Sequence, residues 1–265
     1  MSFFIKKDKT MIEETKSALT KLKFYGMLGA LDTRLTEATS YGWGHVELLS
    51  ALTQDEKTYR DNLASSRRVK AARFRTDASF EQFDSTAKRN VTKTQVQDLR
   101  ELRFLKEPRN VLILGPTGVG KTFLATAIGN HACRLGFACT FIGVNLLIEK
   151  ITIARADGTF LKLRDRLIRT DVLILDDLGI KPLPVDLVQD LYDILEERYQ
   201  NRSTIITSQL PLTNWKEVIQ DPVALEAILD RLIHGAVKIE LKGESYRKKR
   251  MRRVDNECDP VEIQN

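Results

Sequence analysis

A glycine-rich stretch at 115–122, "GPTGVGKT", has the residue types and spacing that hold a nucleotide's phosphates. Gly115, Gly120, Lys121 and Thr122 match the pattern G-x-x-x-x-G-K-[ST] in full. Glycines permit positive φ and bring backbone N–H groups close to phosphate oxygens, while the lysine reaches the β- and γ-phosphates and the threonine hydroxyl can ligate Mg²⁺. The residues predicted to bind ATP are Gly115, Pro116, Thr117, Gly118, Val119, Gly120, Lys121 and Thr122.

An acidic pair follows a second apolar run, "DVLILDDLG" at 171–179. The run is typical of a buried strand, and Asp176 and Asp177 stand at its carboxyl end. We expect Asp176 to hold Mg²⁺, together with Thr122, and Asp177 to orient or deprotonate the attacking water. Since the usual pair is Asp-Glu, the shorter Asp177 must lie closer to that water or act through another one. Taken alone, the pair also fits a strand end followed by an Asx-type turn.

A third polar strand end occurs in "STIITSQLP" at 203–211. Ser208 and Gln209 follow four apolar or β-branched residues, so one of them is expected near the γ-phosphate. An ordinary polar strand-to-loop boundary is the competing interpretation.

The elements around these motifs predict an α/β fold. From about residue 76, β-rich runs alternate with helical runs, which implies a five-stranded parallel sheet flanked by helices. Ligands bind such sheets at the carboxyl ends of the strands, where the motifs lie. The predicted strands are Val111–Leu114, Cys139–Val144, Val172–Leu175, Thr204–Thr207 and Ala236–Leu241.

Residues 11–75 form a different, helical region, with a turn at 40–45, "SYGWGH". Apolar residues recur there near a 3.6-residue period, including Leu28, Leu31, Leu49 and Leu63. These stripes predict the core of a small helical bundle, with a partner-binding face as the alternative. We therefore expect a helical N-terminal domain over 1–75, which binds DNA or a partner, a nucleotide-binding domain over 76–255 and a C-terminal tail over 256–265.

Positive charge is concentrated in two blocks of this 265-residue chain, whose formal net charge is +6. Lys57–Arg75 and Lys242–Arg253 each carry a local charge of +6, so the remainder is acidic. Such blocks suit binding to a phosphate backbone; the alternative is a solvated helix face and a basic tail. The first block supplies the DNA-binding candidates Arg67, Arg68, Lys70 and Arg73.

The remaining composition indicates a cytoplasmic protein with no membrane association. No apolar run reaches membrane-spanning length, and no signal-peptide pattern opens the chain. The three cysteines and three histidines are scattered without metal-ligand spacing, so neither a structural metal nor a disulfide framework is expected.

Taken together, the motifs resemble those of AAA+ ATPases, and within them the IstB and DnaC branch. The resemblance rests on "GPTGVGKT", "LILDDLG", "TSQLP", "ASFEQFD" and "ILDRLIHGAVKIELKGESYRKKR", and covers about residues 15–255. The C-terminal run is most similar to IstB, the helper ATPase of a family of bacterial insertion sequences.

This resemblance implies roles for further residues. Gln209 corresponds to the sensor-1 polar residue, and Phe80 and Phe83 to the segment that lines the adenine pocket. Arg231 corresponds to the arginine finger that reaches a neighbouring subunit's ATP, and Arg247 to the sensor-2 residue of the same subunit. For Arg231, a surface charge paired with Asp230 or Glu226 is the alternative.

The family also has an extra helix between the second and third strands, here within 146–169. Basic residues in it are further DNA-binding candidates: Arg155, Lys162 and Arg164.

The combined expectation is an ATP- and Mg²⁺-dependent homo-oligomer that assembles on duplex DNA, largely regardless of sequence, and delivers it to a partner transposase. One alternative is a helicase loader of the DnaC type, with a replicative helicase as partner. Another is a small-molecule phosphotransferase, which the basic blocks and the two arginines disfavour.

Overall fold

The structure is a computed structural model and describes residues 2–83 and 89–245. The chain divides into two units, Met1–Arg67 and Arg68–Asn265. The domain boundary expected near residue 75 stays a prediction, and the tail at 256–265 lies outside the described residues.

The first unit is built from three helices, α1 (Ser2–Lys21), α2 (Tyr25–Tyr41) and α3 (His45–Ala72), the last of which continues into the second unit. α2 and α3 meet where the Glu56 carboxylate accepts hydrogen bonds from the backbone N–H groups of Gly26 (2.7 Å) and Met27 (3.1 Å). A carboxylate is favourable at a helix N-terminus because it meets the positive end of the helix dipole. Gly26 permits this approach, since a Cβ there would lie 2.6 Å from the Cα of Glu56.

The apolar stripes of this unit form a smaller core than predicted. Leu31 and Leu52 are its buried apolar side chains among the described residues, whereas Leu49 is 62% and Leu63 38% exposed. Polar contacts also join α2 to α3, such as the pair between Arg34 and Asp55 at 2.7 Å. Helical periodicity marks an apolar face but does not say whether a neighbour covers it.

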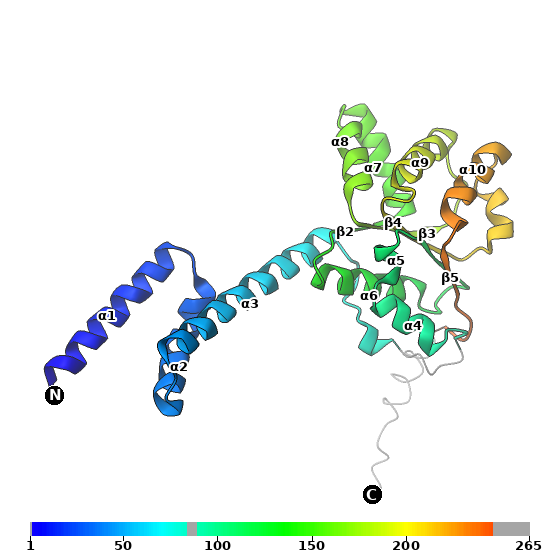
Figure 1. Cartoon of the computed structure of the whole chain (residues 1–265). Coiled ribbons are helices and arrows are strands. Elements are labelled where there is room, and N and C mark those ends of the chain that lie inside the picture. The colour runs from blue at the N-terminus through cyan, green and yellow to red at the C-terminus, as the bar shows by residue number, and fades with distance from the viewer. Residues whose placement is uncertain (1, 84–88, 246–265) are drawn as a thin grey trace, which may run out of the picture. The chain divides into compact units, whose positions relative to one another are not determined.

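The second unit contains a five-stranded sheet, as predicted, and every strand pair in it is parallel. Its spatial order is β2-β3-β4-β1-β5, and Figure 1 labels β2, β3, β4 and β5. The strand bounds are β1 Val111–Leu114, β2 Cys139–Gly143, β3 Val172–Leu178, β4 Ser203–Ser208 and β5 Val237–Glu240.

Helices cover both faces of the sheet. Ile113 and Ile174 face one apolar cluster with the buried side of α6, while their neighbours Leu112 and Leu173 face the other cluster with α7, α8, α9 and α10. This division follows from the two-residue repeat of a strand. The bounds are α4 Lys93–Arg100, α5 Arg103–Lys106, α6 Lys121–Arg134, α7 Val144–Ala156, α8 Phe160–Arg169, α9 Val185–Arg198 and α10 Pro222–Ile233, with short 3₁₀ turns η1 Phe80–Gln82 and η2 Leu212–Glu217.

The segment between β2 and β3 contains two helices, α7 and α8, in agreement with the extra helix expected within 146–169. Gly158, with φ of +74°, lies in the turn that separates them. Glycine takes this left-handed conformation without steric cost.

Candidate nucleotide-binding site

The phosphate loop connects the end of β1 to the start of α6. Gly115, Gly118 and Gly120 have φ of +143°, +85° and +103°. Glycine is required at position 115 for two reasons. Its φ is positive, and a Cβ there would lie 2.2 Å from the carbonyl oxygen of Leu241, just after β5. The loop therefore takes its shape from its own sequence and from the neighbouring strand.

Lys121 begins α6 and is 4% exposed. Its Nζ donates a hydrogen bond to the carbonyl oxygen of Pro116 at 2.9 Å, so the ammonium group lies over the loop. The N-terminus of α6 points its backbone N–H groups and the positive end of its dipole to the same place, which is a site suited to phosphate.

Asp176 is fully buried near the end of β3. Its Oδ1 accepts hydrogen bonds from the hydroxyl of Thr122 (2.9 Å) and from that of Thr207 (2.7 Å). Burial raises the pKa of Asp176, the Thr207 hydroxyl opposes that shift, and the charge of Asp177 adds to it. Its other oxygen, Oδ2, is buried without a hydrogen-bond partner among the described residues.

This arrangement fits Mg²⁺. A buried carboxylate oxygen with no protein partner is costly unless a cation or water meets it. Because the proton of Thr122 is committed to Asp176, the lone pairs of its hydroxyl oxygen remain available to a metal ion. Mg²⁺ takes oxygen ligands of this kind, with one or two carboxylates and the substrate phosphates.

Asp177 lies at an irregularity in β3. Leu175 pairs with Ile206, but Leu178 pairs with Ser208, so β3 has one extra residue between these pairs. Asp177 adopts φ of +60° there, and its backbone N–H donates to the Thr207 hydroxyl at 2.9 Å. A bulge of this kind re-aims side chains next to a functional site. Among the described residues, no side chain is hydrogen-bonded to the Asp177 carboxylate, which leaves it open to a water molecule.

The end of β4 separates the two sensor candidates. Ser208 is fully buried, and its hydroxyl donates to the carbonyl oxygen of Leu178 at 2.7 Å. Gln209 instead accepts a hydrogen bond from the hydroxyl of Thr117, in the phosphate loop, at 2.6 Å. The geometry thus favours Gln209 for contact with the γ-phosphate.

The two phenylalanines assigned to the adenine pocket differ in position. Phe83 stacks on Phe123 at a ring distance of 6.5 Å, directly after the phosphate-loop residues. Phe80 packs edge-on against His131 at 5.6 Å. Because Phe123 and His131 are eight residues apart on α6, these contacts lie about 12 Å apart along the helix axis. Phe83 is therefore the one near the nucleotide loop.

Arg231, the predicted finger, is paired within its own chain. Its guanidinium contacts Glu196 on α9 and Asp230 beside it, and lies 5.1 Å from the ring centre of Tyr199. Arg247, the predicted sensor-2 residue, lies outside the described residues.

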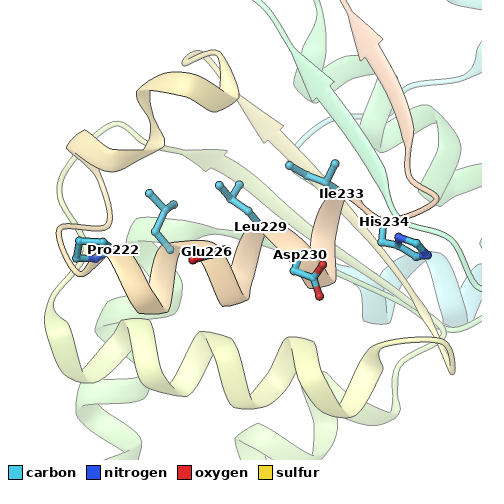
Figure 2. A pocket seen from close by; sticks show the side chains of 7 residues that line it. Pro222, Glu226, Leu229, Asp230, Ile233 and His234 are labelled. Atoms are coloured by element: carbon cyan, nitrogen blue, oxygen red, sulfur yellow. The ribbon is translucent and has the colours of Figure 1, made fainter.

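The helix that carries Arg231 also has a groove along one face, with a volume of about 480 Å³. Figure 2 shows this face of α10. The groove is lined by Pro222, Leu225, Glu226, Leu229, Asp230, Ile233 and His234.

The basic candidates at the end of α3 are not equivalent. Arg67, Lys70 and Arg73 are exposed. Arg68 is half-buried, and its Nε donates to the carbonyl oxygen of Cys133 at 2.8 Å. Exposed side chains remain available to a phosphate backbone, whereas Arg68 also anchors α3 to α6. Of the second basic block, residues 246–253 lie outside the described residues.

The candidates on α7 and α8 also differ. Arg155 pairs with the buried Asp190 at 2.7 Å, and Arg164 lines a groove with the acidic residues Asp193, Glu196 and Glu197. Lys162 is exposed. Arg155 is thus paired with α9 and Arg164 lies in a groove that α9 also lines, and contact of the three residues with DNA stays a prediction.

Sequence reasoning missed Thr207 as a site residue, and it placed Thr117 in the phosphate loop without foreseeing its contact with Gln209. The partners of the two threonines, Asp176 and Gln209, are 31 and 92 residues away in the chain. The available signal for Thr207 was a hydroxyl residue near the end of a strand, but β4 contains several such residues, so the sequence alone does not single out Thr207.

The parallel sheet, the phosphate loop after β1 and the acidic pair in β3 define a P-loop nucleotide-binding protein of the AAA+ type. The chain belongs to the family described as IstB-like ATP binding protein, whose model matches residues 17–254. It is thus an ATP-binding protein of a P-loop ATPase family.

Relatives with curated names agree with this assignment. A Sinorhizobium fredii protein named as an insertion sequence ATP-binding protein is 36% identical over 239 residues, which are 90% of this chain and 98% of the relative. A Mycobacterium tuberculosis protein, named as an ATP-binding protein in an insertion sequence, is 34% identical over 88% of this chain and 93% of its own length.

Solved structures show the same fold. The crystal structure of DnaI covers 62% of this chain and 91% of its own, with a TM-score of 0.54 and 24% identity. The DnaC helicase loader covers 62% of this chain and 97% of its own, with a TM-score of 0.50 and 22% identity. No helix within the described residues is long and apolar enough to cross a membrane.

Proposed function

We propose that this protein is an ATP-dependent DNA-binding helper that assembles on duplex DNA and delivers the DNA to a partner transposase. One observation carries the proposal: the hydroxyls of Thr122 and Thr207 both donate to the Asp176 carboxylate, so the phosphate loop, β3 and β4 meet in one candidate ATP site. Relatives of this chain are named for insertion sequences. ATP binding is the assembly switch, and hydrolysis resets it.

A few side chains of the site are assigned to ATP binding and hydrolysis. Lys121 and the loop N–H groups bind the phosphates, Thr122 and Asp176 hold Mg²⁺, and Asp177 orients or deprotonates the attacking water. Gln209 contacts the γ-phosphate from the end of β4. A bound Mg²⁺ would supply positive charge that neutralises the charge developing on the transferred phosphoryl group.

Contact with DNA is assigned to the exposed cations Arg67 and Lys70 near the end of α3 and to Arg73 directly after it. Lysine and arginine on a helix neutralise backbone phosphates without reading base edges. Binding is therefore expected to depend on duplex length and salt and little on sequence.

Assembly is assigned to the α10 face. Arg231 acts as a finger only if α10 meets the ATP site of another subunit, and the groove beside it offers apolar surface for such a contact. DNA that aligns subunits raises the local concentration of fingers, so DNA stimulates ATP hydrolysis. If assembly on DNA also tightens ATP binding, linkage requires that ATP tighten DNA binding by the same factor.

The test measures binding of a fluorescent duplex by anisotropy, with ATP and with ADP, and the DNA-stimulated ATPase rate. We expect tighter binding with ATP and a salt slope of about −0.9 per neutralised phosphate. Arg67→Ala with Lys70→Ala should weaken DNA binding, while the control Lys106→Ala with Lys216→Ala, which removes the same charge from other exposed sites, should not. Equal affinity with both nucleotides would contradict the switch, and equal weakening by both double variants would contradict the assigned DNA surface.

The partner is tested separately. Purified transposase encoded beside this protein should be retained on immobilised duplex only when this protein and ATP are present. If the protein were a helicase loader, a replicative helicase would be retained instead of the transposase. The only support for that role is the similarity of fold to DnaI and the DnaC helicase loader.

A further inference from the structure

The hydroxyl of Thr207 joins the two acidic residues of the site. It donates to Oδ1 of Asp176 at 2.7 Å and accepts from the backbone N–H of Asp177 at 2.9 Å. We propose that Thr207 is a positioning residue for ATP hydrolysis, which holds Asp176 in its metal-binding orientation and Asp177 in its bulged conformation. This inference rests on the proposed roles of Asp176 and Asp177.

The donor and acceptor capacities of one hydroxyl account for both contacts. Its single proton goes to Asp176, and a lone pair receives the Asp177 N–H. With Thr122 on the same oxygen, Oδ1 is occupied by two donors, and Oδ2 is the carboxylate oxygen left without a hydrogen-bond partner among the described residues. Loss of the Thr207 hydroxyl would remove one of the two donors that hold Oδ1 and would leave the backbone N–H of Asp177 without its partner.

The Asp177 backbone needs such a partner. A residue other than glycine with φ of +60° is strained, and the conformation persists only where its surroundings hold it. The regular pairing of β3 with β4 is interrupted between Leu175 and Leu178, so ladder hydrogen bonds do not supply that hold.

Thr207 is itself well fixed. It is fully buried and pairs with Ile113 of β1 on the other side of β4. The strand that precedes the phosphate loop therefore also fixes the position of the Thr207 hydroxyl. Through this residue, the pairing of β1 with β4 helps to determine where the acidic pair of β3 lies.

Other buried hydroxyls of β4 have different partners. The Thr204 hydroxyl accepts from Nε of Arg198 at 3.0 Å, and that of Ser203 donates to the carbonyl oxygen of Phe104 at 2.9 Å. Within β4, Thr207 is the one hydroxyl bonded to a carboxylate. Thr204 is thus a matched control on the same strand.

The experiment compares Thr207→Val, Thr207→Ser and the control Thr204→Val. Since a small misplacement can cost 10²-fold, we expect Thr207→Val to lower kcat by about 10- to 100-fold while the ATP dissociation constant changes less than about threefold. Thr207→Ser keeps the hydroxyl and should restore most of kcat. Thr204→Val should lower the melting temperature but leave kcat near the wild-type value.

Two readouts separate positioning from general damage. In an Asp177→Asn background, Thr207→Val should cause a smaller loss of kcat than in the wild type, because the part of the loss that acts through Asp177 has already occurred. The amide resonance of Asp177 should shift in Thr207→Val and return in Thr207→Ser. If the valine variant does not fold, Thr207→Ala, which adds no new methyl group, takes its place in every measurement.

The proposal is overturned if Thr207→Val retains wild-type kcat, if Thr204→Val lowers kcat equally, or if the losses with Asp177→Asn simply add. A wild-type protein that binds ATP without hydrolysing it would instead contradict the proposed ATPase cycle. In that case the Asp177 amide shift still decides whether Thr207 holds the bulge.

Discussion

Arg231 on α10 and Glu196 on α9 form a bidentate ion pair. The Nε of Arg231 contacts one carboxylate oxygen of Glu196, and its Nη2 lies 3.4 Å from the other. The Asp230 carboxylate accepts a hydrogen bond from Nη1 of Arg231 at 2.5 Å. The hydrogen bond from Arg231 to Glu196 holds the pKa of the guanidinium above its usual range. An arginine that reaches another subunit's ATP must first leave these partners.

Glu196→Gln therefore tests the finger directly. Loss of the carboxylate charge weakens the contact within the chain, so the DNA-stimulated ATPase rate should rise at limiting protein concentration. The rate is measured over a range of protein concentrations, with Glu197→Gln on the same helix as the control. A fall in rate, like that of Arg231→Ala, would instead mark the pair as structural.

Arg231→Ala should lose the DNA-stimulated rate while still binding ATP. A finger supplied in trans is worth about 10³- to 10⁵-fold in rate. Mixing Arg231→Ala protein with Lys121→Ala protein should restore part of the activity, because mixed interfaces join an intact loop to an intact finger. Mixed oligomers that form but stay inactive at every ratio would contradict action in trans.

Lys121→Ala should abolish ATP binding or hydrolysis. The side chain is buried in the loop and hydrogen-bonded to Pro116, and no other described residue of the loop is a cation. Binding of a fluorescent ATP analogue and phosphate release measure the effect, and circular dichroism checks the fold. Undiminished turnover would show that another site hydrolyses the nucleotide.

Asp177→Asn should keep ATP binding and block turnover, by about 10²- to 10⁴-fold if it acts as the general base. The variant should also stay longer on DNA, since the ATP-bound state persists. Asp176→Asn should instead weaken the dependence of ATP binding on Mg²⁺. Normal turnover by Asp177→Asn together with loss in Asp176→Asn would reverse the assigned roles.

Arg198 should be a major contributor to stability. It is 1% exposed, and its guanidinium donates to carbonyl oxygens at the end of α8 and at β4, including Leu167 at 2.8 Å and Thr170 at 2.7 Å. Arg198→Met leaves several buried acceptors unpaired, so it should cost about 3–5 kcal/mol of unfolding free energy. Denaturant unfolding measures this loss.

Arg202→Met is the control for that change. Arg202 is partly exposed and pairs with Asp171, so its loss should cost at most about 1 kcal/mol. Similar losses in the two variants would show that the carbonyl contacts of Arg198 contribute little.

Local sequence determined the phosphate loop and the sheet. The pattern Gly115–Thr122 and the run of four apolar residues before it depend on neighbouring residues alone, and the structure has β1 at Val111–Leu114 as predicted. The other four strands were expected within one to three residues of their ends. The largest difference is in β3, which continues through Asp176 and Asp177 to Leu178, because a bulge let polar residues remain in the strand.

Tertiary structure decided how the side chains combine. Ser208 and Gln209 are adjacent and polar, and only packing shows that one is buried against Leu178 while the other reaches Thr117. Likewise, the sequence does not distinguish Arg231 from other exposed helical arginines, and only the packing of α9 against α10 shows its ion pair with Glu196. Periodicity and motif spacing report which face or loop a residue occupies. Contacts between residues far apart in the chain depend on sheet order and helix packing, which no local pattern contains.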